Sequence, residues 1–161
     1  MDKVFRMKAR HIGNFATWLN SVQLLGKESR ARSRFTKILT DYLSNDVEKQ
    51  RVEIVKKYAK LDEEGNPSVI IDSKARRIFD VLPEKSEEMN KEYANLLEHN
   101  LELHVTDLNR ETISTVKDVV LNSQFVFGPL DNDPEQVRQA KIALADNYTE
   151  WCESFEKLDT A

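Results

Sequence analysis

The chain has 161 residues and a mass of 18.7 kDa, the usual size of one domain, so we expect a single domain over residues 1–161. Its longest purely aliphatic runs, at 69–71 and 119–121, have only three residues, which excludes a segment that spans a bilayer. Residues 1–10 lack the apolar block of a secretory signal peptide, and a lone cysteine excludes an internal disulfide framework. We therefore expect a soluble, intracellular protein.

The net charge of −4 conceals a strong asymmetry along the chain. Residues 1–60 carry 14 basic and 6 acidic side chains, whereas residues 61–161 carry 10 basic and 22 acidic ones. Such a difference can give separate basic and acidic surfaces that meet partners or hold copies of the protein together. The alternative is that the two halves neutralise each other within one fold.

In the first half, an alternating pattern predicts a strand at 4–10, and an i, i+3, i+4, i+7 apolar stripe predicts a helix at 14–25. Gly13 separates these two elements, and Gly26 is a natural end for the helix. A near-heptad pattern then predicts a long helix at 29–61, with a bend where residues 44–46 can form a fresh cap.

The second half alternates strand and helix patterns. The predicted elements are a strand at 68–72, one or two helical turns at 74–81, a helix at 86–100, a strand at 101–105, a helix at 108–122, a strand at 125–127 and a last helix from residue 134. Asp133 is the predicted cap of this last helix and Pro134 its first residue. Its predicted core stripe is Val137, Ala140, Leu144, Tyr148, Trp151 and Phe155. The fold class that follows is α+β, a helix-rich single domain with one long helix and a small, antiparallel sheet.

Candidate catalytic chemistry is sparse in this sequence. His11, His99 and His104 form no HExxH or i, i+4 pair, so we expect no metal site. Cys152 lies between Glu150 and Glu153, whose charges raise a thiol pKa instead of activating the sulfur. The glycines are isolated and form no phosphate-binding loop. These observations predict a non-enzymatic protein without a cofactor.

A basic cluster is the strongest candidate for a binding surface. Lys27, Arg30, Arg34 and Lys37 follow a 3-4-3 spacing along the long predicted helix, with Arg32 nearby. Arginine at such density suits phosphates or partner carboxylates, because its planar fork binds pairs of oxygens. The cluster is a solvated helix face, a protein-binding face or a nucleic-acid contact. The last reading lacks interleaved aromatic residues and sits in an acidic protein.

The same region carries a resemblance to a known family. Residues 26–32 (Gly-Lys-Glu-Ser-Arg-Ala-Arg), 58–67 and 93–98 resemble a family of small phage and prophage proteins of Firmicutes that has no assigned function. The resemblance covers roughly residues 15–105. It implies a phage or prophage origin and action in the cytoplasm of the bacterial host, and it brings no catalytic residues.

The function we expect from these features is stoichiometric binding to a host protein, in particular inhibition of a nucleic-acid-processing defence enzyme such as a CRISPR nuclease. The contact uses either the basic cluster or an acidic surface that imitates nucleic acid. The acidic candidates are Glu84, Glu87, Glu88, Asp131, Asp133 and Glu135. The alternatives are an accessory role in virion or tail assembly and nucleic-acid binding by the basic cluster. A homo-oligomer is left open, and no membrane partner is expected.

Overall fold

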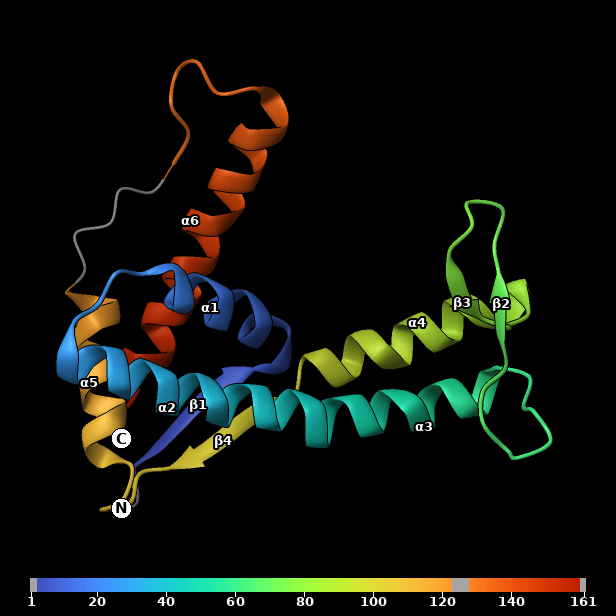
Figure 1. Ribbon diagram of the computed structural model, residues 1–161, viewed down its shortest axis with the longest axis horizontal. Coiled ribbons are helices and arrows are strands. Elements are labelled where there is room, and N and C mark those ends of the chain that lie inside the picture. Colours follow the sequence, from blue (N-terminus) through green and yellow to red (C-terminus); the bar gives the residue numbers. More distant parts are fainter. Residues whose placement is uncertain (1–2, 123–127, 160–161) are drawn as a thin grey trace. The chain divides into compact units, whose positions relative to one another are not determined.

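The computed structural model describes residues 3–122 and 128–159, and the chain divides into two compact units (Figure 1). The first unit is formed by residues 1–40 together with 100–161, and the second by residues 41–99. The chain passes from the first unit into the second between Thr40 and Asp41, inside a helix. The single domain over residues 1–161 that we expect from the sequence is still a prediction.

The first unit contains an antiparallel pair of strands and four helices among its described residues. Strand β1 (Val4–Lys8) pairs with β4 (Asn100–His104), so that Phe5 lies opposite Leu103. The helices are α1 (Ala9–Ser21), most of α2 (Gly26–Tyr42), α5 (Arg110–Leu121) and α6 (Glu135–Glu156). Along β1, Phe5 and Met7 are buried and Arg6 is exposed, as expected for a strand with one face on a core.

The core of this unit is an aromatic cluster. Its members are fully buried and come from β1, α1, α2 and α6: Phe5, Phe15, Phe35, Trp151 and Phe155. The centroids of the Phe5 and Phe155 rings are 4.8 Å apart, and those of Phe5 and Phe35 are 5.4 Å apart. Each such pair contributes about 0.5–1.5 kcal/mol beyond its buried area. The cluster therefore fixes α2 and α6 to the sheet.

The second unit is an antiparallel helix pair with a short hairpin (Figure 1). Its elements are the π-helical segment η1 (Leu43–Val47), α3 (Glu48–Tyr58), β2 (Val69–Ile71), β3 (Arg77–Phe79) and α4 (Pro83–Leu97). Val47, Val55 and Leu96 are its buried apolar residues. The guanidinium of Arg51 lies 5.5 Å from the centroid of the Phe79 ring, which links β3 to α3.

The fold class predicted from the sequence is confirmed: the chain is α+β, rich in helix, with small antiparallel sheets. The predicted long helix is present as a helical stretch that runs without interruption from Gly26 to Tyr58. The bend expected at 44–46 coincides with η1, where the helix is locally π-helical. The predicted strand at 125–127 lies outside the described residues.

Several local predictions are wrong. Residues 74–81 are not helical turns, because Arg77–Phe79 forms β3 and pairs with β2. Gly13 ends no strand: α1 begins at Ala9 and passes through this exposed residue. Gly26 begins α2 instead of ending α1, which stops at Ser21 where Val22 becomes extended.

The last helix also differs from its prediction. Pro134 is the N-cap residue of α6 and Glu135 its first helical residue, so Asp133 does not cap the helix. Of the predicted core stripe, only Trp151 and Phe155 are buried, whereas Val137 is 40% exposed. The apolar periodicity of α6 is thus used only near its C-terminal end.

Candidate partner-binding surface

Helix α2 holds a group of cations on its exposed side. Lys27, Arg30 and Arg34 are spaced three and four residues apart, which places them on one side of the helix. Phe35 and Leu39 of the same helix are fully buried in the core of the first unit. The helix is therefore anchored by its apolar residues, and the cations project from its exposed side.

Next to these cations, a hollow of about 190 Å³ lies between α2 and α5. Its lining residues define what we call the basic hollow: Lys27, Arg30, Ala31, Arg34, Glu111, Thr112 and Thr115. Lys27 Nζ lies 2.8 Å from Glu111 Oε1, so one of the cations is paired across the hollow. The threonines provide hydroxyl groups that can donate to a bound oxygen.

The electrostatics of the basic hollow favour a bound anion. The hydrogen bond and the charge of Lys27 lower the pKa of Glu111, and the charges of Arg34 and Arg30 lower it further. Neither arginine forms an ion pair with any residue that the structure describes. Three cations thus surround one carboxylate, and two guanidinium groups remain available for an oxygen pair supplied from outside.

The other two members of the predicted basic cluster lie elsewhere. Arg32 Nη1 donates to the backbone oxygen of Val22 at 2.6 Å, and its Nη2 donates to Ser29 Oγ at 3.3 Å. Arg32 is therefore a structural residue that holds the segment between α1 and α2. Lys37 is exposed one turn beyond Arg34 and does not line the basic hollow.

The acidic candidates do not belong to one unit. Glu84, Glu87 and Glu88 lie on α4 in the second unit, whereas Asp131, Asp133 and Glu135 belong to the first. The carboxylate of Asp133 accepts hydrogen bonds from Lys141 Nζ at 2.7 Å and from the backbone N–H of Leu130 at 2.6 Å. These bonds lower the pKa of Asp133 and show a role at the start of α6.

The charge asymmetry of the sequence disappears within the first unit. Residues 1–40 carry nine basic and two acidic side chains, and residues 100–161 carry five basic and twelve acidic ones. Ion pairs join the two segments, as between Arg6 Nε and Glu102 Oε1 at 2.7 Å and between Lys27 and Glu111. In this unit the two segments neutralise each other, and the basic hollow is a local excess of positive charge.

No family model, curated protein or solved structure matches this chain. None of the helices in the described part of the chain is long and apolar enough to cross a membrane. The candidate surface therefore rests on the chemistry and geometry of its own residues.

The histidines and the cysteine are not gathered into a site. Within residues 3–122 and 128–159, no group of three or more His, Cys, Asp and Glu side chains is placed to hold a metal ion. His99 and His104 are exposed on different units. Burial raises the pKa of the Cys152 thiol, and the charge of Glu156 raises it further, so the sulfur is poorly suited to act as a nucleophile.

A second cavity, of about 400 Å³, was missed by the sequence analysis. Its lining residues come from both ends of the chain, from the residue that follows β4 and from α5: Lys3, Val105, Arg110, Ile113, Ser114, Lys117, Leu158 and Asp159. Lys117 and Asp159 form an ion pair in its wall, which lowers the pKa of Asp159. No spacing in the sequence signals this cavity, because only the fold brings residues 3 and 159 together.

Proposed function

We propose that this protein is non-enzymatic and acts by stoichiometric binding to a host protein through the basic hollow. The observation that supports this proposal is the pair Arg30 and Arg34, which line the hollow and form no ion pair with any of the residues described. The hollow accommodates an acidic side chain, whose carboxylate accepts hydrogen bonds from the two guanidinium groups. Thr112 and Thr115 complete the set of donors.

A protein carboxylate suits the basic hollow better than a nucleic-acid backbone. Glu111 lines the hollow and repels any further negative charge that enters it. The two arginines can balance the single charge of one carboxylate, but they cannot balance the several charges of a run of phosphates. The lining residues include no aromatic side chain on which a base could stack. The net charge of −4 also disfavours association with a polyanion.

The resemblance to small Firmicutes phage proteins includes residues 26–32, and this stretch supplies Lys27 and Arg30 of the basic hollow. We propose that the protein comes from a phage or prophage and acts in the host cytoplasm. Its proposed partner is a nucleic-acid-processing defence enzyme such as a CRISPR nuclease, an anti-CRISPR role. Accessory function in virion or tail assembly is the alternative.

The test is capture of partners by the tagged protein in host extract, followed by titration against the purified partner. Each desolvated pair of charges contributes about 1–3 kcal/mol, so the double variant Arg30→Glu/Arg34→Glu should weaken binding at least about tenfold. The matched control is Lys85→Glu/Lys91→Glu, which changes the net charge equally on exposed residues of α4. Capture of tail proteins alone, or tight binding to a DNA duplex without any protein partner, contradicts the proposal.

A further inference from the structure

Within residues 3–122 and 128–159, no strand pairs with the edge of β2 that faces away from β3. The backbone N–H of Asp80 donates to the oxygen of Ser68, and the N–H of Asp72 donates to the oxygen of Arg76. These two bonds show which backbone groups of β2 point toward β3. Because hydrogen-bonded and non-hydrogen-bonded pairs alternate in an antiparallel ladder, the N–H and C=O groups of Val69 and Ile71 point away from β3. The segment around Lys60 pairs with the residues that precede β2, but it does not cover the outer edge of β2. The N–H of Ser68 donates to the Lys60 oxygen on the side that faces β3.

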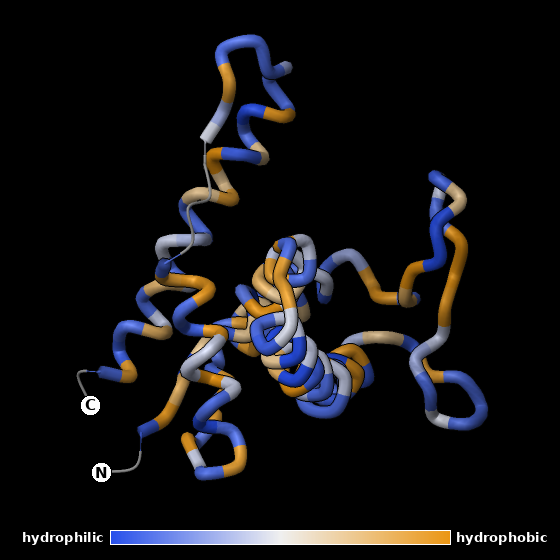
Figure 2. The backbone as a smooth tube through the Cα atoms, turned by 60° about the vertical axis from the view of Figure 1, so that its left-hand side comes forward, coloured by the Kyte–Doolittle hydropathy of each residue, from blue (hydrophilic) through white to orange (hydrophobic). Residues whose placement is uncertain are grey.

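The side chains of this hairpin are unusually exposed for their type. Val69 is 45% exposed, Ile70 44%, Ile71 64% and Ile78 40%. In Figure 2, where the tube is coloured by residue hydropathy, parts of the hairpin have the colour of hydrophobic residues. A sheet of two strands is marginal in water and is stabilised when further strands extend it. Exposed apolar side chains beside an open edge are typical of a surface that pairs with another strand.

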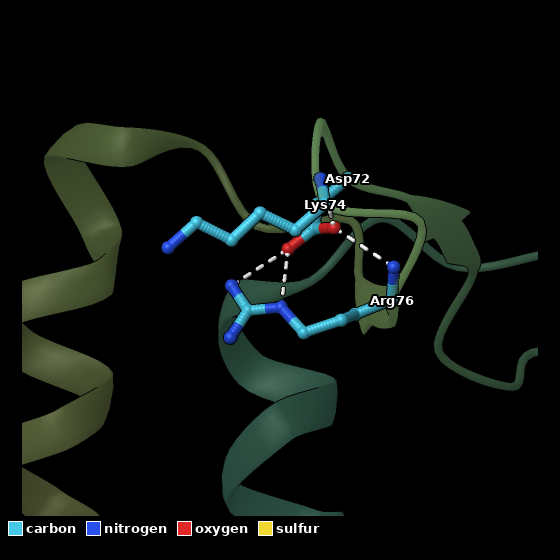
Figure 3. A network of polar contacts seen from close by, with 3 residues as sticks. All are labelled: Asp72, Lys74 and Arg76. Carbon is cyan, nitrogen blue, oxygen red and sulfur yellow. Dashed lines mark hydrogen bonds and ion pairs between the residues drawn. The ribbon is translucent and has the colours of Figure 1, made fainter.

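Charges of opposite sign lie at the two ends of β2. The turn before it contains Asp62, Glu63 and Glu64, and the turn after it contains Lys74 and the Asp72–Arg76 ion pair, followed by Arg77 (Figure 3). Glu63, Glu64, Lys74 and Arg77 form no ion pair with any described residue. The strand is thus acidic at one end and basic at the other.

We propose that the open edge of β2 pairs with β2 of a second copy of this chain. In this arrangement the two strands are antiparallel about a two-fold axis that passes beside Ile70. Val69 of each copy then forms a hydrogen-bonded pair with Ile71 of the other, which satisfies the outward backbone groups. The product is a four-stranded antiparallel sheet, with the two β3 strands at its edges.

The charges favour a second copy over an unrelated strand. Antiparallel pairing about Ile70 places the acidic turn of each copy next to the basic turn of the other, at both ends of the interface. The two Ile70 side chains meet at the axis and are removed from water. The same strand therefore supplies the apolar contact, the backbone pairing and both complementary charges.

A cysteine crosslink tests the register. In a non-hydrogen-bonded pair the Cα atoms are about 4.5 Å apart, a distance that a disulfide spans. The variant Ile70→Cys, made in a Cys152→Ser background, should form a crosslinked dimer on mild oxidation. Ile71→Cys and Ile142→Cys in the same background should crosslink far less, because neither residue faces its own copy. Equal crosslinking by all three overturns the proposed pairing.

Charge reversal tests the interface in solution, by sedimentation equilibrium of the full chain. Glu63→Lys/Glu64→Lys and Lys74→Glu/Arg77→Glu should each weaken self-association by about tenfold or more, and an equimolar mixture of the two should restore a dimer. A wild-type protein that stays monomeric at millimolar concentration overturns the proposal. Arg30→Glu/Arg34→Glu should dimerise normally, so this test is independent of the basic hollow.

Discussion

Two turns of the second unit are built in the same way but with different residues at one position. In each, an aspartate side chain, Asp62 or Asp72, accepts hydrogen bonds from backbone N–H groups two and four residues later. The residue three positions after the aspartate has a positive φ, which is +80° at Gly65 and +58° at Ala75. Glycine adopts this conformation freely, whereas a side chain resists it. Ala75 is therefore strained where Gly65 is not.

Exchange of these residues should change stability in opposite directions. Ala75→Gly relieves the left-handed strain and should raise the free energy of unfolding by up to about 1 kcal/mol, partly offset by the greater freedom of glycine when unfolded. Gly65→Ala introduces the same strain and should lower it by about 1 kcal/mol. Urea unfolding of both variants measures the effects. Destabilisation by Ala75→Gly contradicts this account of the turn.

Tyr58 has a strongly shifted ionisation. Its hydroxyl donates to Glu92 Oε1 at 2.6 Å, and this bond raises the pKa of Tyr58 to about 12. Lys57 Nζ lies 2.9 Å from the other oxygen of Glu92, and these two bonds, that of Tyr58 first, lower the pKa of Glu92. The three residues join α3 to α4.

The pH dependence that follows can be measured by tyrosinate absorbance. Because the folded pKa of Tyr58 is raised, its contribution to stability is complete below the ordinary value of 10.0 and is lost as the pH rises toward about 12. Tyr58→Phe should remove the titration step near pH 12 from the tyrosine absorbance and flatten the alkaline loss of stability. An unchanged titration curve in this variant contradicts the assignment.

Among the elements, the helices were the most predictable from sequence and the hairpin the least. The apolar stripes of α1 and α5 reveal their inward faces, since Phe15, Leu19 and Val116 recur at helical spacing and are buried. Strand β3 has no such signal, because Arg77-Ile78-Phe79 is short and follows a charged turn. Its structure is decided by pairing with β2 and by the contact of Phe79 with Arg51, both of which lie beyond local sequence.

Helix α6 should respond very differently to substitutions at its two ends. Phe155 is fully buried against Phe5 and Phe35, so Phe155→Ala should cost about 3–5 kcal/mol of unfolding free energy. Val137 is 40% exposed, and Val137→Ala should change stability by less than about 0.5 kcal/mol. Thermal or urea unfolding distinguishes the two. A similar cost at both positions shows that the N-terminal part of α6 is also packed.

At the scale of the molecule, only one of the two walls of the basic hollow could be predicted from the sequence. Helical spacing identifies Lys27, Arg30 and Arg34 as one side of α2, and all three line the basic hollow. The opposite wall, which includes Glu111 of α5, comes from a segment more than 70 residues away and carries no pattern that links it to α2. Position on the helix likewise could not show that Arg32 bonds to the backbone of Val22.

The ion pairs between residues 1–40 and residues 100–161 should make the stability of the first unit sensitive to acid. Arg6 lowers the pKa of Glu102, and Lys27 lowers that of Glu111, in each case by a hydrogen bond first and by charge second. A carboxyl whose folded pKa is lowered stabilises the fold above its unfolded value, here 4.5, and this stability is lost as the pH falls through the folded pKa. The thermal midpoint should therefore decline as the pH falls below about 5, and less steeply in high salt, which screens exposed pairs.

Glu102→Gln should show a smaller acid-induced decline than the wild type, because the substituted side chain no longer titrates. A midpoint that is constant or rises on acidification would show that the ion pairs between residues 1–40 and 100–161 do not stabilise the first unit.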